Sequence, residues 1–81
     1  MSTLEFKFRG LEVGYFEEQT FPKKDGRYRY MPYRGPGHYE MATALEKGVA
    51  AEIEFVDSGT TRKAKAKHIE YGLLELSEFS P

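Results

Sequence analysis

The 81-residue chain contains no cysteine and only two histidines. Without cysteine it can form no disulfide and supply no thiolate to a metal ion. His38 and His68 are too few for a zinc site made of protein side chains unless carboxylates join them. We therefore expect no metal site and no cofactor, and the absence of disulfides fits a reducing compartment.

Long apolar runs are also missing. No stretch approaches the roughly 20 apolar residues that span a bilayer. The first five residues lack the basic and apolar regions of a signal peptide. We expect a cytoplasmic protein without membrane contact, folded as a single domain over 1–81. Residues 77–81 are expected to fray as a terminal tail.

The sequence has no recognisable catalytic motif. There is no Gly-x-Ser-x-Gly, no His-x-x-x-His and no lysine-containing phosphate loop. A histidine could act as a general base, His38 beside Arg34 being the best placed, but nothing in the spacing favours it. The chain is therefore expected not to be an enzyme.

Charge is unevenly distributed although the net charge is only −1. Residues 20–39 carry five cationic side chains against one acidic side chain, which leaves the remainder of the chain at −5. The total argues against a globally basic nucleic-acid binder. The local excess draws attention to this one segment.

Alternation of apolar and polar residues predicts strands in the first part of the chain. The first two are expected over about 3–9 and 11–18, with Leu11, Val13 and Tyr15 on the inward face and Phe16 on the other. A loop over 19–26 leads to a strand from Arg27 to about 31 or 33. That strand is expected to be an edge strand or to end at Pro32.

The segment 38–47 fits two readings. As a strand it alternates Tyr39, Met41, Thr43 and Leu45 with polar or small residues. As a helix it places apolar residues three and four positions apart, and its composition is rich in helix formers. We predict a short helix, with a strand as the alternative.

The residue pattern in the second half of the chain predicts a β-hairpin. Strands over 49–56 and 61–68 flank a turn at 57–60, and Gly72 precedes a last strand at 73–76. A turn centred between Ser58 and Gly59 places Glu54 opposite Lys63 and Glu52 opposite Lys65. The lysine stripe is thus expected to be a neutralised, solvated face and not a phosphate site.

These elements predict an α+β fold: a small, strongly bent antiparallel sheet of five or six strands with one short helix at about 38–47. The alternative is an all-β roll or a small barrel of the SH3-like kind, as an architectural comparison only, in which that segment is another strand. The expected core is Leu4, Phe6, Phe8, Leu11, Val13, Tyr15, Tyr30, Met41, Leu45, Ile53, Phe55, Ile69, Tyr71, Leu74 and Leu76.

The segment 27–39 is the strongest functional candidate because it combines arginine with tyrosine. Both residue types are enriched where proteins contact one another. We expect a non-enzymatic interaction module that binds a partner protein or a second copy of itself through this segment. The candidate binding residues are Arg27, Tyr28, Arg29, Tyr30, Tyr33, Arg34, Gly35, Gly37 and His38. The plainer reading is that the two strand tyrosines are core residues.

Two other chemistries fit the same segment less well. A single-stranded nucleic acid would meet phosphate-binding cations and stacking rings. The cations in question are Lys23, Lys24, Arg27, Arg29 and Arg34. An anion could also bind where a helix starts near His38, because backbone N–H groups, Arg34 and an imidazole would converge there.

Overall fold

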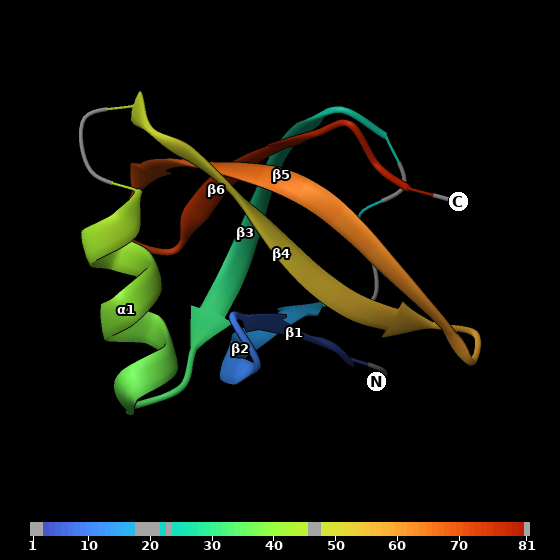
Figure 1. Cartoon of the computed structure of the whole chain (residues 1–81), viewed down its shortest axis with the longest axis horizontal. Helices are drawn as coiled ribbons and strands as arrows, with labels where there is room; N and C mark the ends of the chain where they lie inside the picture. The colour runs from blue at the N-terminus through green and yellow to red at the C-terminus, as the bar shows by residue number, and fades with distance from the viewer. Residues whose placement is uncertain (1–2, 18–21, 23, 46–47, 81) are drawn as a thin grey trace.

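The structure is a computed structural model that describes residues 3–17, 22, 24–45 and 48–80. It contains six strands and one helix (Figure 1). In chain order these are β1 Thr3–Phe8, β2 Leu11–Glu17, β3 Gly26–Pro32, α1 Pro36–Ala44, β4 Ala50–Asp57, β5 Thr60–Glu70 and β6 Leu73–Ser77.

The strands form a closed antiparallel barrel in the order β1-β2-β3-β6-β5-β4. Two three-stranded meanders, β1 to β3 and β4 to β6, are joined by the pairs β3–β6 and β1–β4. The helix α1 connects the meanders and lies at one end of the barrel (Figure 1). The prediction of a small antiparallel β fold with one short helix is confirmed. The sheet closes into a barrel, as the alternative prediction proposed. That alternative also assigned the segment 38–47 to a strand, whereas its described part up to Ala44 is helical.

The hairpin of β4 and β5 has the predicted register. Glu54 lies opposite Lys63, and Glu52 lies opposite Lys65. The turn places Ser58 and Gly59 at positive φ, 53° and 79°, as the tight turns that match strand twist require. Turn chemistry therefore fixes which side chains of this hairpin face the solvent.

Strand β2 departs from the predicted alternation. Its register with β1 shifts between Phe6 and Lys7, and Val13 is the additional residue. Such a bulge moves every later side chain to the opposite face. Phe16 is consequently buried in the core and Tyr15 faces outward, half-buried. The prediction of the reverse arrangement is wrong for both residues.

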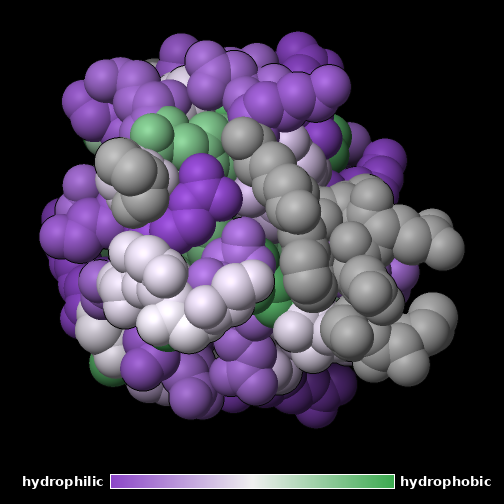
Figure 2. Space-filling model, turned by 90° about the vertical axis from the view of Figure 1, so that its right-hand side faces the viewer, coloured by the Kyte–Doolittle hydropathy of each residue, from purple (hydrophilic) through white to green (hydrophobic). Residues whose placement is uncertain are grey.

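The core fills the barrel interior. Its buried apolar members are Leu4, Phe6, Phe8, Val13, Phe16, Tyr30, Met41, Leu45, Ile53, Phe55, Ala64, Ala66, Leu74 and Leu76. From the end opposite α1, the surface is mostly polar, with apolar residues showing only in small separate areas (Figure 2).

Besides Tyr15, three further residues predicted to be core are not buried. Leu11 begins β2 at the barrel rim and is exposed, and Ile69 lies at the register shift between β5 and β6. Tyr71 occupies the turn before Gly72, which has φ 82°, and its side chain is exposed. In each case a turn or bulge removes the side chain from the alternating pattern.

The helix α1 begins two residues earlier than predicted, at Pro36. Proline suits the first helical position because its missing N–H would have no helical partner there. Met41 and Leu45 are buried against the barrel. The predicted end of the helix at 46–47 lies outside the described residues.

The predicted C-terminal tail makes several contacts with β5. The backbone N–H of Ser80 donates to the carbonyl of Lys63 at 2.7 Å, and its hydroxyl accepts from the Lys63 N–H at 2.7 Å. Phe79 packs against the core, with its ring 6.4 Å from that of Phe55. These contacts give a physical reason to expect the tail to stay attached, and Pro81 lies outside the described residues.

Candidate functional site

The strand β3 divides the candidate segment between two faces. Arg27, Arg29 and Met31 are exposed, whereas Tyr30 is buried and Tyr28 is half-buried. This follows from the two-residue period of a strand. The arginines and the two strand tyrosines therefore do not form one joint surface.

Tyr30 belongs to the buried core, and Tyr28 packs against it. The ring of Tyr30 lies 5.3 Å from that of Phe6, edge to face, and Tyr28 packs on the core from one end. The hydroxyl of Tyr28 donates to the Lys24 carbonyl at 2.7 Å. The plainer reading of these two residues, as core tyrosines, is the one that the geometry supports.

The hydroxyl of Tyr30 is buried and has no hydrogen-bond partner of good geometry among the described residues. Burial raises the pKa of Tyr30, and the nearby backbone of Gly72 partly opposes this shift. A buried hydroxyl without a partner destabilises the fold. Tyr30 is thus a residue whose ring contributes to stability and whose oxygen opposes it.

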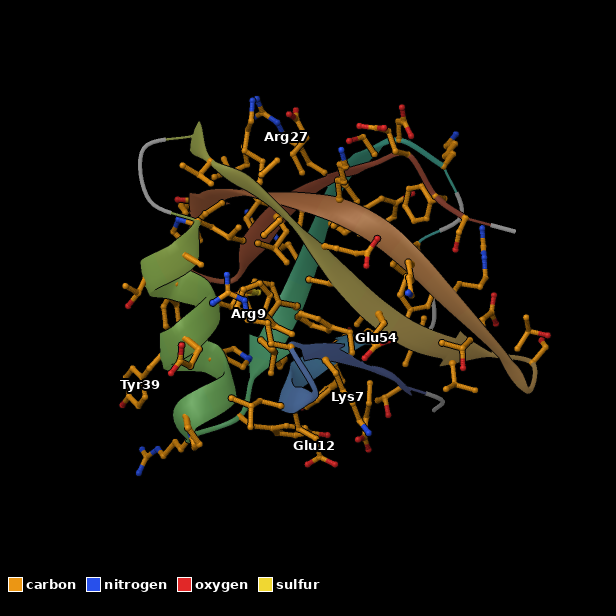
Figure 3. The ribbon with its side chains drawn as sticks, viewed as in Figure 1. Lys7, Arg9, Glu12, Arg27, Tyr39 and Glu54 are labelled. Atoms are coloured by element: carbon orange, nitrogen blue, oxygen red, sulfur yellow. The ribbon has the colours of Figure 1, made fainter. Side chains whose placement is uncertain are left out.

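The three arginines lie in different surroundings. Arg27 forms an exposed ion pair with Glu75 on β6 at 3.8 Å, and Figure 3 shows it on a different side of the molecule from Tyr39. Arg29 lines a groove with Met31 and Tyr71. Arg34 is exposed just before α1. Lys23 lies outside the described residues, so the predicted set of cations is not seen as one cluster.

Tyr33 faces outward beside Tyr15, with 5.6 Å between ring centroids. Desolvation is the main cause of the raised pKa of Tyr33. The Glu5 carboxylate, which accepts a hydrogen bond from the Tyr33 hydroxyl, raises that pKa further. The bulge in β2 brings Tyr15 to this surface, which is why the alternation pattern did not reveal it.

The Gly35–Gly37 segment shapes the start of α1. Gly37 is buried, and a side chain there would overlap the backbone carbonyl of Glu12. Arg34 and these glycines line a shallow groove with Lys7. The close approach of two backbones explains why glycine is needed at Gly37.

His38 turns away from that groove. Its ring lies 5.5 Å from Tyr71, 5.9 Å from Tyr39 and 6.2 Å from Tyr30. Burial lowers its pKa, and the neighbouring His68 lowers it further. The imidazole therefore does not join Arg34 in the predicted anion site.

These contacts join into one exposed surface that the sequence did not predict as a whole. Tyr15 lies opposite Met31 across the β2–β3 pair, Met31 and Tyr71 share a groove of about 470 Å³, and Tyr71 reaches His38. We call it the tyrosine surface and define it as Tyr15, Arg29, Met31, Tyr33, His38, Tyr39 and Tyr71. The sequence predicted a bend at Gly72 but gave no sign that Tyr71, the residue before it, contacts His38.

Metal and membrane features can be assessed only for the described part of the chain. There, no three side chains of histidine, aspartate or glutamate come together as a metal site would require. No helix among the residues described has the length and apolar character needed to cross a membrane. The side chains of the tyrosine surface are four tyrosines, the Met31 thioether, the His38 imidazole and the Arg29 guanidinium.

The chain was compared with models of protein families, with curated protein sequences and with solved structures, and no match was found in any of the three comparisons.

Proposed function

We propose that this chain is a non-enzymatic protein-interaction module that binds a partner through the tyrosine surface. The observation that carries the proposal is the exposure of its large apolar side chains. Met31, Tyr39 and Tyr71 are 50%, 67% and 73% exposed. Tyrosine supplies large contact area at low entropic cost, and it is favoured at interfaces for that reason.

The shape of the groove supports the same function, and its lining carries one cation, Arg29, and one carboxylate, Glu17. The groove between Met31 and Tyr71 offers a place for one apolar side chain of a partner, as interface anchors require. Arg29 lines its rim, is exposed and forms no ion pair within the residues described. An arginine at the edge of an apolar anchor site can pair with a carboxylate of the partner.

The first test asks whether the partner is a second copy. Sedimentation velocity over a range of protein concentrations measures self-association directly. If the wild type dimerises, Met31→Ser/Tyr71→Ser should restore the monomer. The matched control is Val49→Ser, which removes an exposed apolar side chain outside the surface.

The second test applies if the wild type is a monomer. Random peptides displayed on phage are selected against the immobilised chain, and enriched peptides are measured by isothermal titration. We expect Met31→Ser/Tyr71→Ser to weaken binding by about tenfold or more, as loss of an anchor does, and Val49→Ser to leave it unchanged. Failure to enrich any peptide, or equal binding to both variants, contradicts the proposal.

Single-stranded nucleic acid is the second candidate. It is favoured by Arg29 and Arg34, which are exposed and unpaired within the described residues. It ranks lower because the ring of Tyr30 is buried and the ring of Tyr28 packs against the core, so neither forms an open stacking platform for bases. Anisotropy of labelled RNA and DNA at about 50 and 200 mM salt tests it. Binding that falls steeply with salt and is lost in Arg29→Ala supports it, and no binding at low salt removes it.

A further inference from the structure

The barrel is joined least extensively between β1 and β4. Within the described residues these strands pair at only two positions, Phe6 with Phe55 and Lys7 with Glu54. The neighbouring β4 and β5 pair at eight positions. The closure of the barrel therefore depends on a short seam.

Beyond the seam the two strands separate. Continuing the register would pair Glu5 with Val56, but β1 and β4 do not pair there. A groove of about 430 Å³ opens instead, lined by 3–5 of β1, by Val56 of β4 and by Thr61 of β5. An edge that lacks a neighbouring strand presents free N–H and C=O groups, which are a template for another strand.

The charge around this groove is predominantly negative. Glu5, Glu12 and Glu54 line it, and Lys7 is the single cation among its lining residues. Figure 3 shows Lys7, Glu12 and Glu54, from three different strands, on the same side of the barrel. A ligand that complements this groove therefore carries positive charge.

We propose that the β1–β4 groove binds an extended basic segment of a partner protein, which adds to the open edge of β1 as a further strand. Backbone hydrogen bonds would supply affinity, and alternating lysine or arginine side chains would meet the carboxylates. A second copy is disfavoured as the occupant because its own groove carries the same negative charge. The groove borders the tyrosine surface at Glu5 but shares none of its defining residues.

Three synthetic peptides test the proposal on the wild-type chain. The basic probe is acetyl-Thr-Lys-Val-Lys-Val-Lys-amide, the acidic probe has glutamate in place of lysine, and the third is the basic probe with the backbone nitrogen of every lysine and valine methylated. We expect amide chemical shifts of 3–5 and Val56 to move with the basic probe alone. The methylated probe fails because it cannot donate the ladder hydrogen bonds.

Variants identify the charges that matter. Glu12→Gln/Glu54→Gln should weaken binding of the basic probe by about tenfold, a typical loss for two charge contacts. The matched control Glu40→Gln/Glu70→Gln removes two exposed carboxylates that do not line the groove and should bind as the wild type does. Met31→Ser/Tyr71→Ser should also bind normally, which separates this site from the proposed function.

Several results would overturn the proposal. These are no shift with the basic probe at millimolar concentration, equal binding of the acidic or methylated probe, or shifts confined to the tyrosine surface. Equal weakening by both charge variants would show that only net charge matters. An amide spectrum of each variant verifies that it is folded before binding is measured.

Discussion

Tyr28 and Tyr30 lie two positions apart on one strand, yet their hydroxyl groups have different surroundings. The oxygen of Tyr28 reaches the Lys24 carbonyl at the surface, whereas that of Tyr30 is buried without a good partner. A buried hydroxyl that lacks a hydrogen bond costs about 1–3 kcal/mol. The same chemical group therefore acts in opposite directions at the two positions.

Tyr30→Phe should raise the free energy of unfolding by up to about 1 kcal/mol, because it removes an unsatisfied oxygen and keeps the ring. Tyr28→Phe is the matched control and should lower stability by about 0.5 kcal/mol, since it loses an exposed hydrogen bond. Urea denaturation of both variants measures the two values. A loss of stability in Tyr30→Phe would mean that the hydroxyl has a partner in solution.

His38 makes stability depend on pH. Its folded-state pKa lies below the ordinary value of 6.5, through burial and then through His68. The unfolded chain therefore binds a proton more readily than the folded chain does. Stability conferred by neutral His38 is complete above pH 6.5 and decreases as pH falls through 6.5 toward the lower folded-state pKa.

Urea denaturation from about pH 8 down to pH 5 tests this, a range in which most carboxylates stay charged. The wild type should lose stability in the lower part of the range. His38→Gln should remove much of that loss, and His68→Gln should remove a smaller share. An unchanged pH dependence in His38→Gln would contradict the assignment.

At the scale of elements, α1 depends on close packing at its first turn. Gly37 approaches the backbone of Glu12 so closely that an added side chain would overlap the carbonyl oxygen. Alanine is otherwise the better helix former, by about 1 kcal/mol. Packing and propensity thus predict opposite signs for the same substitution.

We expect packing to prevail. Gly37→Ala should lower the free energy of unfolding by more than about 1 kcal/mol, because two backbones must move apart. Thr43→Ala, at an exposed helix position, should raise it by up to about 0.5 kcal/mol. Thermal unfolding of both variants compares the signs. Stabilisation by Gly37→Ala would show that β2 and α1 are not in contact as described.

The sequence allowed elements with strong local signals to be predicted. The β4–β5 register follows from its turn, and α1 follows from composition. The bulge at Val13 was not predicted, because it is set by the pairing of β2 with β1; its one local signal is Gly14, a glycine inside a strand, which can mark either a bulge or a close backbone approach. That one additional residue exchanged Tyr15 and Phe16 between surface and core.

Local signals in the sequence also located part of the candidate surface, but not the contacts between distant elements. Arg29, Tyr33, Arg34 and His38 are at or near the surface as a local reading suggested. Tyr71 was missed, because its contact with His38 joins elements that are more than 30 residues apart in the sequence. Alternation within one strand carries no information about such contacts.

At the scale of the whole molecule, the barrel is closed by contacts distant in sequence. Within each meander, strands that follow one another in the sequence pair, whereas β1–β4 and β3–β6 join the two halves. The tail adds to this closure, since Phe79 lies between the rings of Tyr28 on β3 and Phe55 on β4. The Arg62 guanidinium lies over both Phe55 and Phe79.

Phe79→Ala should therefore lower the free energy of unfolding by about 1–3 kcal/mol, less than for a fully buried phenylalanine because the ring is half-buried. Glu78→Ala is the matched control. It removes an exposed ion pair with Lys65 and should cost at most about 0.5 kcal/mol. Urea denaturation and amide exchange of Lys63 measure the two effects. If both variants are as stable as the wild type and the Lys63 amide exchanges freely, the tail frays and the barrel closes without it. If Phe79→Ala alone is destabilised, the final residues are part of the fold, because Phe79 packs against the core from outside the six strands.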